Sequence, residues 1–263
     1  MARAASRPNS TAYVLHSHDW SESSLILDLF TREQGRVVAV AKGAKRPYSQ
    51  LRPVLMPFQR LTVAFGARQP EEDEVWLLRQ AEWAGGPAWP GGAALLPGFY
   101  LNELLMRMLQ RHDPHPALFD AYAQALNALA TPSLLQAGLR AFELSLLRQL
   151  GYLPDLSTLT VGGQAVQADT RYELHPEWGV AVADGGSAAA ECVGGAVLRD
   201  IEHALNAGRD GPGVVGTPHL GPLMAACLPA LNELKTALRS LLHYHLGTQT
   251  LRTRQLMMEL HQA

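Results

Sequence analysis

The sequence of 263 residues lacks the features typical of secreted and membrane-spanning proteins. Its two cysteines, Cys192 and Cys227, are too few for a disulfide framework, and neither has a partner at C-x-x-C spacing. No window approaches the roughly 18 to 20 consecutive apolar residues that a membrane span requires. The basic N-terminus is not followed by the apolar segment of a secretory signal. We therefore expect a cytoplasmic protein outside the membrane.

The sequence also gives no basis for catalysis. The stretch "LHSHDWSESS" gathers His16, His18 and Asp19 with several serines. Members of a catalytic triad are normally distant in sequence, so a polar hairpin is the favoured interpretation and a hydrolase is a remote alternative. "AKGAK" lacks the G-x-x-x-x-G-K-[ST] pattern of a nucleotide-binding loop. We predict neither enzymatic activity nor a cofactor.

Positive charge is concentrated in one region, although the formal net charge of the chain is −2. Residues 32–68 contain eight lysines and arginines and a single acid, Glu33. Within this region, "VAVAKGAKRPYSQLRP" runs from a strand of small residues into a loop with four cations and no acid. Such a loop can hold a polyanion by releasing condensed counterions. We favour nucleic acid over a loop that is only solvated.

The first third of the chain has the pattern of a small β-barrel. Short apolar and β-branched runs separated by glycine- and proline-containing turns predict five strands, at residues 12–16, 23–31, 35–43, 58–66 and 74–83. Five short strands in this length suit a closed barrel of the oligonucleotide-binding (OB) type better than an open sheet. We predict an OB-fold barrel over residues 1–83.

The remaining residues, 84–263, have a mainly helical pattern. The segment "WAGGPAWPGGAALLPG" marks the boundary, and leucines then recur at helical spacing as far as Gly151. Residues 152–192 are irregular and contain strand-like pieces, and helical stretches follow at about 218–246 and 248–262. The fold class is therefore α+β multidomain: the barrel, then an α-helical domain with a small β-rich insertion.

Two aromatic residues accompany the basic loop. Tyr48 follows Pro47 in polar surroundings, where its ring could stack on a base or simply be solvated. Phe58, in "VLMPFQRL", is expected in the core.

Several separate blocks resemble the RecO family of recombination mediators. "AYVLHSHDWSESSLILDLFTREQGRVVAVAKGAKRP" and "LRPVLMPFQRL" are similar to the N-terminal barrel of that family. "FYLNELLMRML", "LFDAY", "LRAFELSLLRQLGYLPDL" and "LGTQTLRTRQLMMEL" are similar to its helical part, in the same order. The resemblance covers nearly the whole chain.

The resemblance implies a function in DNA repair without catalysis. Family members bind single- and double-stranded DNA and anneal complementary strands. With RecR they help to load RecA on DNA coated by single-strand-binding protein, which implies a cytoplasmic, nucleoid-associated location. The alternative is a protein-interaction adaptor whose barrel binds no DNA.

The resemblance also implies site residues. The block "VAKGAKRP" matches the DNA-contacting loop of the family, so Lys42, Lys45 and Arg46 are the first candidates for phosphate contact, with Arg36, Arg52 and Tyr48 second. Arg140 matches the arginine that contacts the acidic C-terminal tail of single-strand-binding protein, and the apolar neighbours expected beside it are Leu139, Phe142 and Leu146. An exposed helix arginine that pairs with a nearby acid is the alternative for Arg140.

The chain departs from the family in one respect. Some RecO proteins carry a four-cysteine zinc module after the "LGY" helix, whereas the corresponding stretch here retains only Cys192. A structural zinc requires four ligands, so we predict no metal. We expect a small β-hairpin to replace it, packed through Tyr172, Leu174, Trp178 and Val180.

Overall fold

The computed structural model describes residues 9–66, 75–86, 91–183, 192–207, 220–247 and 251–262. Arg68 of the basic region lies outside the described residues. The chain divides into two compact units, Met1–Phe119 and Asp120–Ala263. No helix within the described ranges combines the length and apolarity needed to cross a membrane.

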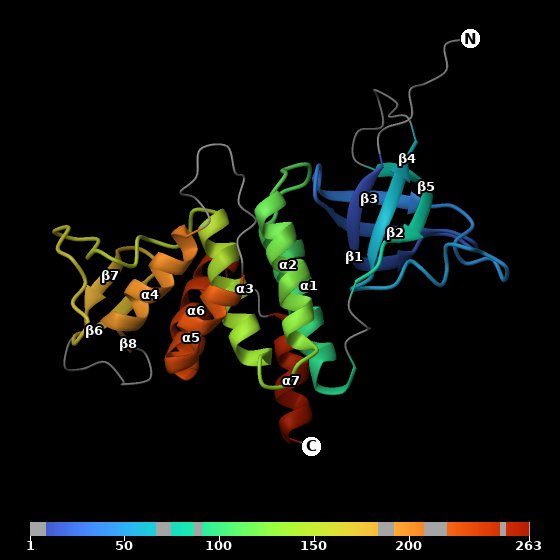
Figure 1. Cartoon of the computed structure of the whole chain (residues 1–263). Helices are drawn as coiled ribbons and strands as arrows, with labels where there is room; N and C mark the ends of the chain where they lie inside the picture. The colour runs from blue at the N-terminus through green and yellow to red at the C-terminus, as the bar shows by residue number, and fades with distance from the viewer. Residues whose placement is uncertain are drawn as a thin grey trace, which may run out of the picture. The chain divides into compact units, whose positions relative to one another are not determined.

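The first unit contains a closed five-stranded barrel, as predicted (Figure 1). Its strands are β1 (Ser10–Asp19), β2 (Leu25–Thr31), β3 (Gly35–Ala41), β4 (Arg60–Phe65) and β5 (Val75–Trp83). They are hydrogen-bonded in the order β1-β2-β3-β5-β4, with β4 closing the barrel against β1. The β3–β5 pair is parallel and the other pairs are antiparallel. The prediction of an OB-type barrel is confirmed.

Strand β1 is buried on both of its faces from Ala12 to Leu15. Ala12 and Val14 point into the barrel core, whereas Tyr13 and Leu15, on the opposite face, are also at most 1% exposed. Tyr13 packs against Phe119, with ring centroids 5.2 Å apart. The barrel therefore has an inner core and a second apolar layer outside β1.

Helix α1 (Leu95–Met108), which follows the short turn η1 (Gly92–Ala94), contributes to this outer layer. The Asn102 side chain donates a hydrogen bond to the Leu15 carbonyl at 2.9 Å. At Gly98 an added Cβ would lie 3.0 Å from the ring of Phe58, so the small residue permits close approach. Phe58 is 2% exposed, which confirms its expected place in the core.

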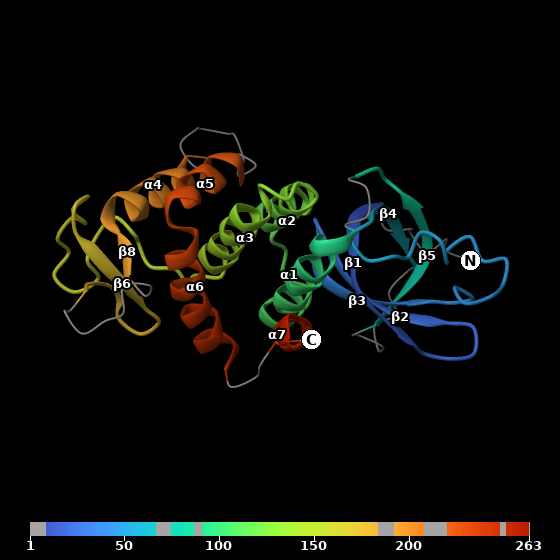
Figure 2. The same cartoon turned by 90° about the horizontal axis from the view of Figure 1, so that it is seen from below.

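The second unit is mainly helical, as predicted (Figures 1 and 2). Its elements include α2 (Pro116–Leu129, shared with the first unit), α3 (Leu135–Gln149), α4 (Gly195–Asn206), α5 (Leu220–Cys227), η3 (Leu228–Ala230), α6 (Leu231–Leu246) and α7 (Arg252–Gln262). Helix α3 packs against both α5 and α6, and every residue from 137 to 147 is buried. This helix is therefore the centre of the second core.

Two helical details differ from the prediction. The expected stretch at 218–246 consists of α5 and α6, separated by η3. Pro229 lies in η3, where its missing N–H donor and fixed φ interrupt a continuous helix. The sequence analysis predicts no helix at the position of α4.

A small sheet occupies the predicted insertion, with β6 (Arg171–His175), β7 (Gly179–Val182) and β8 (Cys192–Gly194) in the order β7-β6-β8. Tyr172, Leu174 and Val180 are buried, as expected. The packing role predicted for Trp178 is wrong. This residue lies in the turn before β7 rather than in a strand, is 50% exposed and stacks on His175.

Candidate nucleic-acid interface

The basic loop connects β3 to β4 over residues 42–59 and is built from successive turns. The backbone N–H groups of Arg46 and Ser49 donate to the carbonyls of Gly43 (3.1 Å) and Arg46 (3.0 Å). Gly43 has φ +73°, a left-handed conformation that favours glycine at the start of the loop. Leu51 and Val54 pack against the barrel core. The loop is therefore anchored on its apolar side, and its polar side chains face solvent.

The loop cations fall into two groups. Lys42, Arg46 and Arg52 are exposed, and within the described part of the chain none of them forms an ion pair. Lys45 instead donates to Asp19 Oδ2 at 2.8 Å and to the Ser21 carbonyl at 3.2 Å. An exposed ion pair of this kind is worth only about 0 to 1 kcal/mol and is easily exchanged for another partner.

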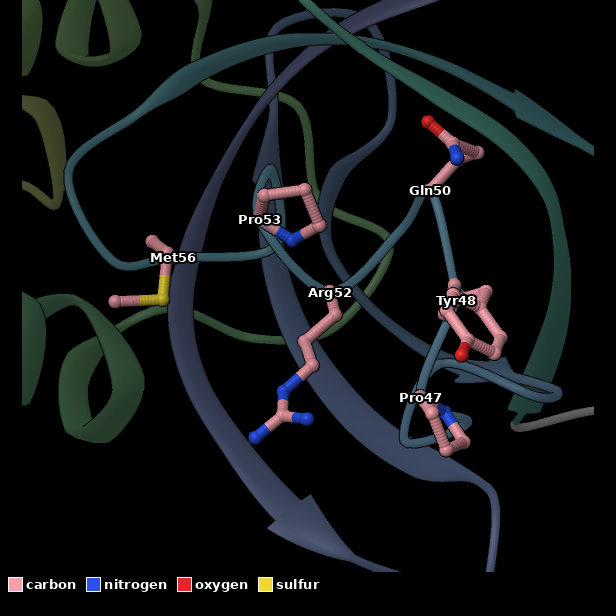
Figure 3. A pocket seen from close by; sticks show the side chains of 7 residues that line it. Pro47, Tyr48, Gln50, Arg52, Pro53 and Met56 are labelled. Atoms are coloured by element: carbon pink, nitrogen blue, oxygen red, sulfur yellow. The ribbon is translucent and has the colours of Figure 1, made fainter.

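Beside these cations the loop forms a hollow of about 560 Å³ that is open to solvent (Figure 3). Its lining residues are Pro47, Tyr48, Ser49, Gln50, Arg52, Pro53 and Met56. Tyr48 is 94% exposed, whereas tyrosine is usually at least partly buried. In the view of Figure 3, the Arg52 side chain extends between Met56 and Tyr48. The hollow thus combines an aromatic ring, a guanidinium group and a thioether.

Arg36 lies apart from this surface. Its Nε is 3.0 Å from Asp28 Oδ1, and its Nη1 donates to the carbonyls of Met106 and Leu109 at the C-terminal end of α1. The arginine side chain is only 16% exposed. A cation at this position satisfies helix carbonyls that have no partner within the helix and complements the helix dipole. The geometry gives Arg36 a structural role, joining β3 to α1.

The turn between β1 and β2 lies against the basic loop, because the Lys45 N–H donates to the Ser23 carbonyl at 3.0 Å. Trp20, in this turn, is 65% exposed and was not selected from the sequence. The only signal available was an aromatic residue in a polar hairpin, which does not distinguish a binding residue from a solvated one. The hairpin itself is confirmed.

The two histidines of this hairpin contact each other. The rings of His16 and His18 meet edge to face, with centroids 4.2 Å apart. Among the described residues, no serine hydroxyl hydrogen-bonds to either ring. Burial lowers the pKa of His16, the charge of His18 lowers it further, and Asp28 opposes both. The arrangement contains no serine–histidine pair of the kind found in a catalytic triad.

Arg140 and its predicted apolar neighbours occupy the core of the second unit. The Arg140 side chain is 7% exposed and its Nη2 lies 2.8 Å from Glu143 Oε1. Leu139, Phe142 and Leu146 are at most 7% exposed. Burial raises the pKa of the Cys227 thiol to about 12, although the charge of Arg140 lowers it. The pairing with an acid that was the alternative for Arg140 is present, but the pair is buried, whereas that alternative placed the arginine on an exposed helix face.

The family of the chain follows from comparison with known proteins. Residues 6–86 match the family described as Recombination protein O N terminal, and residues 92–204 match Recombination protein O C terminal. The chain is 48% identical to the DNA repair protein RecO of Polaromonas sp. (strain JS666 / ATCC BAA-500) over 95% of each chain. It is 47% identical to that of Verminephrobacter eiseniae (strain EF01-2) over 99% of each. The chain belongs to the RecO family of DNA repair proteins.

The N-terminal RecO match includes the whole barrel loop. The structure places Lys42, Lys45, Arg46, Tyr48 and Arg52 together on this loop. Arg36, the remaining candidate of the barrel, is directed to α1 instead. The RecO barrel thus presents five of the six predicted DNA-binding side chains on one element.

In the RecO C-terminal region, a buried ion pair ties the insertion to the helices. Arg148 of α3 makes a two-pronged contact with Glu202 of α4, with Nη1 3.0 Å from Oε1, and also donates to the Pro154 carbonyl. Glu202 in turn accepts the Leu156 N–H at 2.9 Å. Among the described residues, no three histidine, cysteine or carboxylate side chains gather as metal ligands. This pair fixes the entry to the insertion.

Proposed function

We propose that this RecO-family chain is a non-enzymatic recombination mediator that binds single- and double-stranded DNA through its barrel loop. The observation that carries the proposal is the set of exposed cations Lys42, Arg46 and Arg52, which form no ion pair in the described part of the chain. Their charge is not cancelled locally, so it acts on a polyanion within a Debye length of about 8 Å. Lys45 adds a fourth cation once it releases Asp19.

The proposed mechanism of strand annealing is electrostatic. Two DNA strands repel each other through their phosphates, and lysine and arginine side chains offset this repulsion while condensed counterions are released. Contacts to phosphate carry no sequence information, so any pair of complementary strands can be held. Base pairing then supplies the free energy, and the protein performs no bond chemistry.

Replacing Lys42, Lys45 and Arg46 together by alanine tests the proposal. Each lost phosphate contact removes about 0.7 from the slope of log affinity against log salt on single strands and about 0.9 on duplex. We expect the slope to fall by about 2 on single strands, with weaker binding to every oligonucleotide and slower annealing. Fluorescence anisotropy across a salt series measures this, and circular dichroism checks the fold.

A matched control removes the same charge elsewhere. Arg199, Lys235 and Arg239 are exposed on α4 and α6, so their triple alanine variant has the same net charge as the loop variant. We expect it to bind DNA as the wild type does. A folded loop variant with unchanged affinity and slope would overturn the proposal and favour an adaptor whose barrel binds no DNA.

RecR, RecA and the acidic tail of single-strand-binding protein are proposed as partners on the basis of family membership. For Arg140, Leu139, Phe142 and Leu146, a direct tail contact requires the buried helix α3 to become accessible. The variant Arg140→Met with Glu143→Leu removes the pair without leaving a buried charge. If this folded variant binds a tail peptide as the wild type does, Arg140 is not a tail contact. Weakened binding would support the assignment.

A further inference from the structure

The hollow beside Tyr48 has the chemistry of a site for a flat, partly apolar ligand. Tyr48, one of the lining residues, is 94% exposed, and no residue that lines the hollow is acidic. We propose that the hollow binds one unpaired base of single-stranded DNA. This inference rests on the proposed function and adds to it a preference for unpaired over paired bases.

The lining supplies a contact for each part of a base. The Tyr48 ring can stack on one face, a type of contact that every base allows because each has a π-face. The Arg52 guanidinium is planar as well and stacks on aromatic faces while keeping its charge. The rings of Pro47 and Pro53 and the thioether of Met56 provide apolar walls. Ser49 and Gln50 offer polar groups to the edge of the base.

The hollow is already formed without a ligand. Leu51 and Val54 hold the loop on the barrel core, and the Leu55 N–H donates to the Leu51 carbonyl at 3.0 Å. Two of the lining residues are prolines, which restrict the backbone of the unbound loop. A site that is organised in advance loses little conformational entropy when it binds. The loop backbone that carries Tyr48 is therefore anchored, and the exposed Tyr48 ring is accessible to a base.

The surrounding charge favours an anionic occupant, and nucleic acid is the one that the proposed function supplies. Lys42 and Arg46 lie on the same loop, are exposed and have no ion pair among the described residues. They attract the phosphates that flank a base, whereas an apolar peptide segment carries no such charge. In a duplex both faces of each base are covered by its neighbours in the stack, so only an unpaired base can enter. The cations then contact the phosphates of both single- and double-stranded DNA, whereas the hollow binds a base of single-stranded DNA only.

Replacing Tyr48 by alanine tests the proposal on three probes: a thymine oligonucleotide, a strand of equal length with abasic sites, and a duplex. Loss of one base–aromatic stack weakens binding roughly 5- to 140-fold. We expect this loss on the thymine strand alone, with unchanged affinity for the abasic strand and the duplex. The slope against salt should also stay unchanged, because Tyr48 contacts no phosphate. Tyr48→Phe keeps the ring and should bind nearly as the wild type does.

Two further variants separate stacking from other effects. Arg52→Lys keeps the charge and removes the planar guanidinium group that can stack on a base. It should therefore weaken binding to the thymine strand more than to the abasic strand. Trp83→Ala removes another exposed aromatic residue of the same barrel, 64% exposed on β5, and should change nothing.

The failures of the two proposals are distinguishable. If wild-type protein binds DNA with the expected salt slope and Tyr48→Ala binds all three probes as well as the wild type, the base site is refuted and the phosphate surface stands. Equal losses on all three probes also refute it. Absence of DNA binding by the wild type would refute the proposed function itself.

Discussion

Three cations of the barrel loop and two arginines of helix α3 have opposite surroundings. Lys42, Arg46 and Arg52 are exposed and, among the residues described, form no ion pair. Arg140 and Arg148 have side chains only 7% and 17% exposed, and each pairs with a glutamate. The same side-chain chemistry therefore serves two purposes in one chain.

Burial explains the difference. A lone charge in the protein interior loses its hydration and is tolerated only when a counter-charge and hydrogen bonds replace the water. The buried arginines thus contribute almost no net field outside the protein, since their glutamates cancel it. The loop cations keep their field and can act on a ligand. Burial and pairing therefore distinguish these two structural arginines from the cations of the proposed binding loop.

The most disruptive change should be Arg140→Ala. It leaves Glu143, whose side chain is 2% exposed, without its cation in the core of the second unit. Breaking a buried pair by removing one partner costs about 3–5 kcal/mol. We expect a loss of that size in urea unfolding monitored by circular dichroism.

The double variant Arg140→Met with Glu143→Leu is the matched control. Apolar residues of similar volume often replace a buried pair with little loss or with a gain in stability. We expect stability close to that of the wild type. A double variant as unstable as Arg140→Ala would mean that the ion pair itself stabilises the fold, and that the loss in Arg140→Ala does not come from burying the glutamate charge without Arg140.

Arg148→Ala should have the next largest effect, near the lower end of the same range at about 3 kcal/mol. Its pair with Glu202 is more exposed, but the arginine also donates to Pro154 and thereby holds the insertion. Hydrogen exchange should show faster exchange of the Leu156 amide, whose N–H donates a hydrogen bond to Glu202.

The control is Arg239→Ala, on the exposed face of α6, which should lower the free energy of unfolding by less than about 0.5 kcal/mol. Equal effects of the two variants would remove the distinction between paired and exposed cations.

These contrasts explain how far the sequence could predict the molecule. The five strands were predictable because alternation and turn residues are local signals, and the exposed loop followed from its polar composition. Strand β8 has three residues and pairs with β6 about 20 positions away, so no local pattern indicates it. The burial of Arg140 depends on helices that cover α3 on all sides, although a single helix pattern suggests one polar face. Likewise, the direction of Arg36 depends on α1, about 70 residues later.

In the barrel, Asp19→Ala should have a smaller effect on stability than Arg140→Ala and Arg148→Ala in the helical unit. The Asp19 side chain is 75% exposed, so losing its pair with Lys45 should change stability by less than about 1 kcal/mol. The released lysine should strengthen DNA binding, because Asp19 no longer competes for it, and should leave the salt slope on single strands unchanged, because Lys45 already contacts a phosphate in the wild-type complex. Anisotropy titrations of wild type and variant measure both quantities. Weaker binding would show that Asp19 positions Lys45 rather than competing for it.

The smallest effect should appear in the pH dependence of stability. Burial, with the charge of His18 next, lowers the pKa of His16 in the barrel hairpin, and burial also lowers the pKa of His245 in α6. The unfolded chain binds protons at each site near pH 6.5, above the pH at which the folded chain does. The stabilising contribution of each neutral histidine is therefore present above about pH 6.5 and is lost as pH falls through the folded pKa. Because the two histidines lie in different units, each should affect mainly its own unit.

Chemical unfolding between pH 7.5 and 5, monitored separately in the two units by hydrogen exchange, tests this. His16→Gln should reduce the loss of barrel stability as pH falls and leave that of the helical unit unchanged. His245→Gln should reduce the loss of stability of the helical unit and leave that of the barrel unchanged. Each substitution removes the titrating group and keeps a polar side chain of similar length, so packing changes should be small and independent of pH. If neither substitution alters the decline, other groups carry the acid sensitivity. If either substitution alters both units equally, the barrel and the helices unfold as one cooperative body.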